Sequence, residues 1–259
     1  MLDSTGTFSQ PFRVRYEECG AAGTLCAAVH LRYLQELAFA HSAALGYPLT
    51  RYETERLFWL VRRIHLTVHA PARYGQDLLA TTQVVGMRRV LARRHNTVRR
   101  ERDGTLLATA DVDWILTADC VAPTRIPDEM AARFPSQGEA IVSSPLQERQ
   151  PPTSIATISL RIRTSDVDAM GHANHPVYLD FLEDAVTRTG GGAALAAHPR
   201  IYELQYHAAA RAGAELRDVA WQDQGWWHYR LEDAGGVLDR KSTRLNSSHS
   251  RASRMPSSA

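Results

Sequence analysis

Hydrophobic and polar residues follow two similar series along the chain. In the first, residues 12–16 alternate like a strand, and residues 27–45 carry apolar side chains at helical spacing until Gly46. The Asp103-Gly104 pair is typical of a β-hairpin turn. Further strand patterns occupy residues 58–70, 77–85, 91–100 and 105–116. The first half therefore predicts one strand, one long helix and an antiparallel meander.

The same order begins again after residues 134–154, a segment rich in Ser, Pro, Gln and Gly that is typical of a linker. A second helix is predicted over residues 176–189, with Pro176 in its favoured first turn and Gly190 at its end. Strand patterns lie at 155–164, 201–208, 216–221 and 226–232. Residues 12–34 and 160–182 align without a gap at a shift of 148, which is Gly171 minus Gly23. We therefore expect an α+β chain made of two copies of one unit, residues 1–133 and 155–238.

The second series stops early. The first unit continues with a strand at 105–116, whereas the second runs from Leu238 into a polar tail. Residues 239–249 resemble a translated sequencing-library adapter. We therefore expect residues 239–259 to be a foreign, disordered segment and the second unit to lack its last strand. The alternative is a natural Ser- and Arg-rich disordered tail.

Net charge depends on that tail. The whole chain has 30 basic and 28 acidic residues, and removing residues 239–259 takes away five basic residues and one acidic residue. The remaining 25 against 27 give a charge of −2, so nucleic-acid binding loses its support. No apolar run is long enough for a membrane span and no secretion signal is present, which favours the cytoplasm. Three cysteines without a CxxC pair indicate neither a disulfide framework nor a zinc site.

The candidate chemistry lies in the strand-to-helix segment at residues 166–175. Asp168 precedes the predicted helix and is placed to act as a general base. His172 could orient the carboxylate or a water, Asn174 could add an amide hydrogen bond, and the Gly171 N–H could hold the oxyanion. The first unit has Gly20 and Thr24 where the second has Asp168 and His172. The competing interpretation is turn formation and helix capping, which Asp and Asn favour.

Several segments together resemble the acyl-acyl carrier protein thioesterase family. The resemblance is carried by residues 33–41, 57–63, 126–130 and 166–175, and it extends over about residues 8–238. It implies a tandem, or double, hotdog fold, in which a curved antiparallel sheet wraps a long helix twice. It also implies hydrolysis of fatty acyl thioesters carried by acyl carrier protein, with no cofactor and no metal.

The match to that family is incomplete at the candidate site. The resemblance places a catalytic asparagine at Met170, and an acid or cysteine near Ala209 or Ala210. Only Asp168 and His172 match the pattern. The glycine-containing turn after Asp168 also resembles that of single-unit acyl-CoA thioesterases, so acyl-CoA stays open as the substrate. A hydratase or dehydratase on the same fold stays open as well, and so does a non-catalytic acyl-binding protein.

Arginines crowd the strand patterns at 77–85 and 91–100 and their ends. We expect either a solvated sheet face or a docking surface for the acidic carrier, formed by Arg93, Arg94, Arg99 and Arg100. A homodimer stays open.

Overall fold

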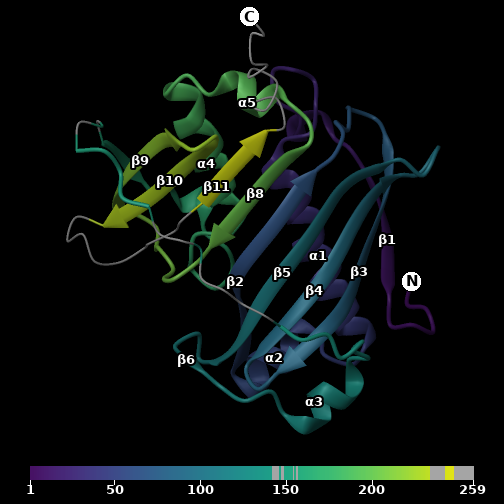
Figure 1. The fold of residues 1–259 in the computed structure, drawn as a ribbon. Coiled ribbons are helices and arrows are strands. Elements are labelled where there is room, and N and C mark those ends of the chain that lie inside the picture. The colour runs from purple at the N-terminus through teal and green to yellow at the C-terminus, as the bar shows by residue number, and fades with distance from the viewer. Residues whose placement is uncertain (142–145, 147–148, 154, 156, 234–242, 248–259) are drawn as a thin grey trace, which may run out of the picture. The chain divides into compact units, whose positions relative to one another are not determined.

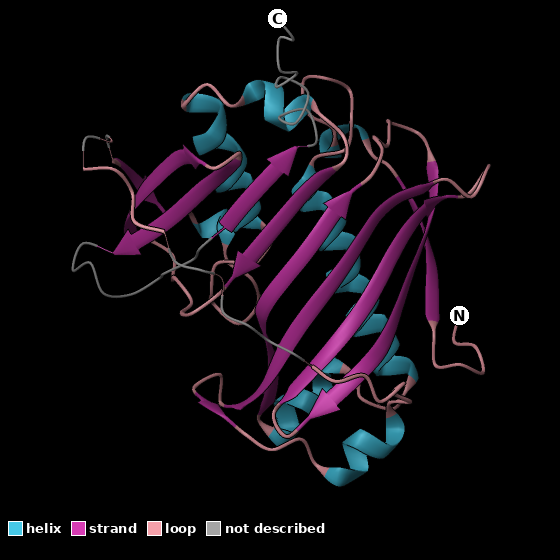
Figure 2. Cartoon of the chain, in the orientation of Figure 1, coloured by secondary structure: helices cyan, strands magenta, loops and turns pink. Residues whose placement is uncertain are grey.

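The structure is a computed structural model that describes residues 1–141, 146, 149–153, 155, 157–233 and 243–247. It divides into two compact units, Met1–Leu66 with Ala70–Pro145 (unit 1) and Leu146–Ala259 with Thr67–His69 (unit 2). The main division falls inside the segment predicted as a linker. Each unit lays a helix against one face of a sheet (Figures 1 and 2). None of the helices in the described ranges has the length and apolar character needed to cross a membrane.

Unit 1 has the predicted strand, long helix and meander. Its sheet has the strand order β1-β3-β4-β5-β2, with β6 beside β5. The short helix α2 was not predicted. Strand β1 ends before the predicted strand does, because the Glu18 carboxylate accepts the Arg15 N–H at 2.8 Å and closes a turn. The elements are β1 (Phe8–Arg13), the 3-10 turn η1 (Tyr16–Glu18), α1 (Ala27–Ala44), α2 (Leu49–Glu55), β2 (Leu57–Val68), β3 (Asp77–Arg88), β4 (Leu91–Arg100), β5 (Leu106–Ala118), β6 (Ala122–Pro123) and α3 (Asp128–Arg133).

Unit 2 repeats this order with shorter elements. Its strands are arranged β7-β9-β10-β11-β8, so that each strand occupies the place of its counterpart in unit 1. The elements are β7 (Ile158–Arg161), the 3-10 turn η2 (Thr164–Asp166), α4 (Val177–Arg188), α5 (Gly192–Ala196), β8 (Arg200–Gln205), β9 (Glu215–Asp223), β10 (Trp226–Asp233) and β11 (Thr243–Ser247).

The duplication is visible in individual main-chain hydrogen bonds. Cys26 N–H donates to the Glu18 carbonyl at 3.0 Å, and Asn174 N–H donates to the Asp166 carbonyl at 2.8 Å, at the predicted shift of 148. Beyond the helix the shift falls to 138, which is Gly213 minus Gly75. These two glycines donate to Val14 and Ile162 in the same way. The shift falls partly because α4 has 12 residues where α1 has 18.

Strand β11 corrects the expectation that unit 2 lacks its last strand and that the whole tail is disordered. It pairs with β10 on one side and β8 on the other, which is the place of β5 in unit 1. Main-chain pairing depends little on side-chain identity, and the single apolar residue, Leu245, lies on the buried face, fully covered. Residues 234–242 and 248–259 lie outside the described residues, and so does most of the predicted tail.

Trp227 packs tightly in unit 2 beside the loop that follows α4. A Cβ placed on Gly191 would lie 2.3 Å from Val186 Cγ1 and 2.8 Å from Trp227 Cε2. Only glycine therefore fits between the end of the helix and the indole. This contact supports a packing role for Trp227.

We predict that Leu245→Ala lowers the free energy of unfolding by about 2–5 kcal/mol, because it empties a fully buried site. Urea denaturation followed by tryptophan fluorescence measures the change. Leu49→Ala is the control, because Leu49 is 48% exposed, and it should cost far less. Equal, small effects of both substitutions would restore the expectation of a disordered tail.

We also predict that Gly191→Ala costs about 1–3 kcal/mol, because the new methyl group must displace Val186 or Trp227. Gly192→Ala is the matched control, since no atom lies within 4 Å of its added Cβ. It should be neutral or slightly stabilising within α5. Differential scanning calorimetry of the two variants would contradict this packing if they melted at the same temperature.

Candidate active site

The candidate site is the turn that joins η2 to α4 in unit 2. Asp168 N–H donates to the His172 carbonyl at 2.8 Å, and Gly171 N–H donates to the Asp168 carbonyl at 2.9 Å. Gly171 has a φ of +76°, a conformation that favours glycine. The backbone of the turn is therefore satisfied by its own groups.

The Asp168 side chain is half-buried and faces back into the turn. Its Oδ1 accepts the N–H groups of Met170 at 2.9 Å and of His172 at 3.3 Å. Within the described ranges no hydrogen bond reaches Oδ2. One oxygen of the carboxylate is thus anchored by the turn, while the other has its lone pairs left for a water or a substrate.

The Gly171 N–H is not left for an oxyanion. The sequence suggested it as an oxyanion donor, but the turn engages it with the Asp168 carbonyl. A donor for the developing charge has to come from elsewhere. The N-terminus of α4, which begins at Val177, carries a positive potential of this kind. This corrects the role expected for Gly171.

His172 and Asn174 are half-buried and flank the turn. Atoms His172 Nδ1 and Asn174 Oδ1 are buried without a hydrogen-bond partner among the described residues. The Asn174 N–H is held by the Asp166 carbonyl, and Asp166 is in turn held by the Arg163 guanidinium at 2.7 Å. Asp168, His172 and Asn174 therefore lie on one short segment, and each of the three keeps one polar atom without a hydrogen bond among the described residues.

Two tyrosines complete the surroundings of this turn, and neither was predicted. The Tyr206 hydroxyl donates to the His175 carbonyl at 3.0 Å, and burial raises its pKa well above the usual value. The Tyr178 hydroxyl accepts the Ala210 N–H at 3.3 Å, while the Ala210 carbonyl accepts the Ala173 N–H at 2.7 Å. The phenol of Tyr178 thus lies beside Ala210, in the loop after β8, where the family resemblance implied an acid or cysteine. An aromatic residue in the first turn of the helix was the only signal for it.

The four arginines proposed as a carrier-docking surface do not share one face. Arg94 is only 7% exposed and points to the core, whereas Arg93 forms a bidentate ion pair with Asp113 at 2.6 and 2.9 Å. Arg99 and Arg100 bind the Asp103-Gly104 hairpin. Adjacent residues of a strand point to opposite sides, so Arg93 and Arg94 cannot act together.

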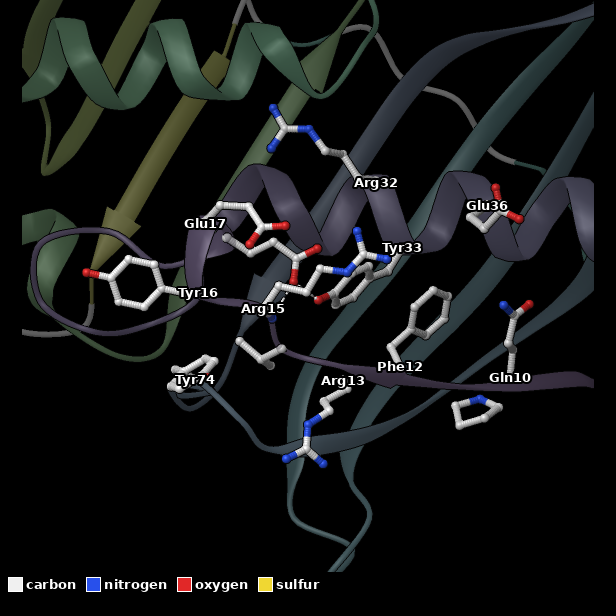
Figure 3. A pocket seen from close by; sticks show the side chains of 13 residues that line it. Gln10, Phe12, Arg13, Arg15, Tyr16, Glu17, Arg32, Tyr33, Glu36 and Tyr74 are labelled. Atoms are coloured by element: carbon white, nitrogen blue, oxygen red, sulfur yellow. Dashed lines mark hydrogen bonds between the residues drawn. The ribbon is translucent and has the colours of Figure 1, made fainter.

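Unit 1 carries a groove of about 950 Å³ between β1, η1 and α1 (Figure 3). Phe12 and Tyr33 stack at 4.4 Å along it, and the Tyr33 hydroxyl donates to Glu18. Burial, and after it this hydrogen bond, raise the pKa of Tyr33. Arginines and glutamates line the groove in equal number, so it offers no net charge to a ligand: Arg13, Arg15, Arg32, Glu17, Glu18 and Glu36. We therefore assign it no part in the chemistry.

No set of His, Cys, Asp or Glu side chains in the described ranges is arranged to hold a metal ion.

Comparisons with known proteins agree with the fold and the duplication. An acyl-ACP thioesterase from Bacteroides thetaiotaomicron superimposes with a TM-score of 0.79 at 15% identity, over 95% of this chain and 99% of that one. The 12:0-ACP thioesterase from Umbellularia californica superimposes with a TM-score of 0.77 at 19% identity, over 93% and 96% of the two chains. No curated protein sequence matches the chain.

Residues 5–134 match the sequence profile of the acyl-ACP thioesterase N-terminal domain. This match covers half of the chain, and the two superpositions extend the same fold over both units. The chain therefore belongs to the acyl-ACP thioesterase family, a family of thioester hydrolases built on the hotdog fold.

Proposed function

We propose that this chain hydrolyses fatty acyl thioesters, preferably those of acyl carrier protein, to free fatty acids, with the Asp168 carboxylate as general base. One observation carries the assignment of Asp168. Unit 1 forms the same turn with a glycine in its place: Gly20 N–H donates to the Thr24 carbonyl at 3.0 Å, and Gly23 N–H donates to the Gly20 carbonyl at 2.8 Å. The turn therefore does not need a carboxylate in order to form.

This comparison weakens the interpretation of Asp168 as a turn former. If the role of Asp168 were only to form the turn, the backbone hydrogen bonds of the turn would depend on its side chain. Gly23 has a φ of +67° and Gly171 has +76°, so the two turns also share their left-handed residue. What unit 2 adds to the common turn is a negative charge with one uncommitted oxygen, which is what a general base requires.

The proposed reaction is a direct attack of water on the thioester. Asp168 accepts a proton from the water as its oxygen bonds to the carbonyl carbon, and the carbonyl oxygen takes the negative charge. The carbon–sulfur bond then breaks, and the thiolate leaves with the proton that Asp168 releases. Since a thiol has a pKa of about 8.5, the leaving group needs no strong acid.

His172 and Asn174 are proposed to orient the reacting groups. Their buried, unpartnered Nδ1 and Oδ1 atoms supply polar contacts beside the carboxylate. Helix α4 begins at Val177, and the positive end of its dipole favours the negative charge that develops on the carbonyl oxygen. Both roles require the turn at residues 168–172 to keep this conformation.

The preference for acyl carrier protein over CoA is supported by the description of the matching family. It is tested with one acyl group presented on both carriers. A higher kcat/KM for the carrier protein thioester supports the preference, whereas a higher value for the CoA thioester would make this an acyl-CoA thioesterase.

We predict that Asp168→Asn lowers kcat/KM by about 10²–10⁴-fold, the range expected when a general base is removed. The substituted amide keeps an Oδ1 that can accept the N–H groups of Met170 and His172, so the melting temperature should change little. Release of free thiol, followed with a chromogenic disulfide, measures turnover.

Asp166→Asn is the control for this experiment. Asp166 is 3% exposed and pairs with Arg163, so its loss should lower stability more than chemistry. If Asp168→Asn retained the full turnover of the parent chain, the assignment of the base would be wrong.

A non-catalytic acyl-binding protein is the second candidate, favoured by Met170 and Ala210. The Ala210 N–H donates to the Tyr178 hydroxyl, and the Ala210 carbonyl accepts the Ala173 N–H, so both backbone groups of Ala210 are engaged. The alanine side chain cannot act as an acid or a base. This candidate predicts that the parent chain binds acyl thioesters without releasing thiol. Binding of a non-hydrolysable acyl thioether by a parent chain that releases no thiol from the matching thioester would favour this candidate over the first.

A further inference from the structure

Two tyrosines in contact in unit 2 use their hydroxyl groups in opposite ways. The Tyr206 hydroxyl donates its proton to the His175 carbonyl at 3.0 Å. The Tyr178 hydroxyl oxygen instead accepts the Ala210 N–H at 3.3 Å. A hydroxyl can accept and donate at the same time, so the bond to Ala210 does not use the proton of Tyr178 and directs it away from Ala210.

The ring of Tyr178 is held from two sides. Its centroid lies 5.7 Å from that of Tyr206 and 6.0 Å from that of Phe181, and both contacts are edge-to-face. The residue belongs to the first turn of α4 and is only 3% exposed. A hydroxyl on a ring confined in this way keeps one position, which is the condition for a donor that is organised before the reaction begins.

One residue, Ala210, connects this hydroxyl to the candidate turn. The Ala210 carbonyl accepts the Ala173 N–H at 2.7 Å, and its N–H donates to Tyr178. Ala173 in turn pairs with Val167, the residue before Asp168. The phenol of Tyr178 therefore lies beside the backbone of the segment that carries the candidate base.

That segment has few main-chain donors left for a substrate. The N–H groups of residues 170–174 all donate within unit 2, three of them to Asp168, one to Ala210 and one to Asp166. The attack of water on a thioester places a negative charge on the carbonyl oxygen, and this charge is stabilised by a donor fixed in advance. The engagement of the main chain favours a side-chain donor, and a tyrosine hydroxyl is one of the groups that serve in this role.

We propose that the Tyr178 hydroxyl donates a hydrogen bond to the thioester oxygen as that oxygen becomes negative. This inference rests on the hydrolysis proposed at Asp168. The attacking water gives its proton to Asp168, while Tyr178 keeps its own proton and only shares it with the oxygen. When the carbon–oxygen double bond forms again and the carbon–sulfur bond breaks, this hydrogen bond weakens. The role does not depend on which acceptor holds the Tyr178 proton before the substrate arrives.

The test compares Tyr178→Phe with the parent chain on the same acyl carrier protein thioester. Phenylalanine keeps the ring and removes the hydroxyl. We expect kcat to fall about 10²–10³-fold, the range for the loss of one oxyanion donor, while KM changes little. Tyr229→Phe is the matched control and should keep the kcat of the parent, because the Tyr229 hydroxyl is buried in unit 2 without a partner among the described residues. Full turnover in Tyr178→Phe would overturn the proposal.

A second variant separates this role from a structural one. Difluorotyrosine at position 178, with both fluorines beside the hydroxyl, keeps the acceptor for the Ala210 N–H but makes the phenol more acidic. Because only the protonated phenol can donate, activity should be lost on the alkaline side at a lower pH than in the parent chain. The same replacement at Tyr229 should leave the pH–rate profile unchanged. An unchanged profile for the variant at position 178 would overturn the proposal, and this measurement decides the matter if Tyr178→Phe does not fold.

The donor and the base fail in distinguishable ways. Turnover lost in Asp168→Asn but kept in Tyr178→Phe would overturn the donor alone. Turnover kept in Asp168→Asn but lost in Tyr178→Phe would overturn the base and leave the donor. A parent chain that releases no thiol would overturn both.

Discussion

The fold depends on how each unit closes the turn from its first strand into its helix. A helix laid against a sheet needs a connection whose buried backbone groups find partners, because an unpaired N–H or C=O costs free energy comparable to a lost hydrogen bond. Both units meet this need with the same main-chain bonds, from residue 20 to 24 and from 168 to 172. Since the backbone satisfies itself, the side chains of the turn are free to differ, and the chemistry proposed for unit 2 rests on that freedom.

The same backbone plan surrounds two different interiors. The inner face of β4 in unit 1 carries Arg94 and Asn96, both buried. In unit 2 the corresponding strand β10 carries Tyr229 and Leu231, which are 1% and 0% exposed. The charges of unit 2 are paired in this layer, because Asp218, which lies opposite Leu231 on β9, binds Arg188 of α4. Arg94 in unit 1 has no carboxylate partner among the described residues.

Much of the fold was predictable from sequence because periodicity reports burial. The apolar spacing at residues 27–45 and the hairpin pair Asp103-Gly104 located α1, β4 and β5 to within a few residues. The helix α2 escaped prediction because seven residues are too few to establish a helical period. Strand β11 escaped because its pairing relies on main-chain groups and one leucine, which a polar composition conceals.

The sequence located the segment that holds the candidate site, but it did not predict the hydrogen bonds within it. Asp168, His172 and Asn174 are close in sequence, so their proximity followed directly. The engagement of the Gly171 N–H and the approach of Tyr178 to Ala210 depend on contacts 3 and 32 residues apart. The burial of Arg94 was hidden for a different reason, since arginines occupy both faces of β4 and the pattern does not say which face is inside.

The claim that the turn forms without a carboxylate is tested most directly by amide hydrogen exchange in Asp168→Gly. This variant gives unit 2 the residue that unit 1 has at position 20. The account predicts that the N–H groups of residue 168 and Gly171 remain protected, because their acceptors are the carbonyls of His172 and of residue 168 itself. Loss of protection at both amides, with the rest of α4 and β9 still protected, would show that the Asp168 side chain builds the turn, and would contradict the account.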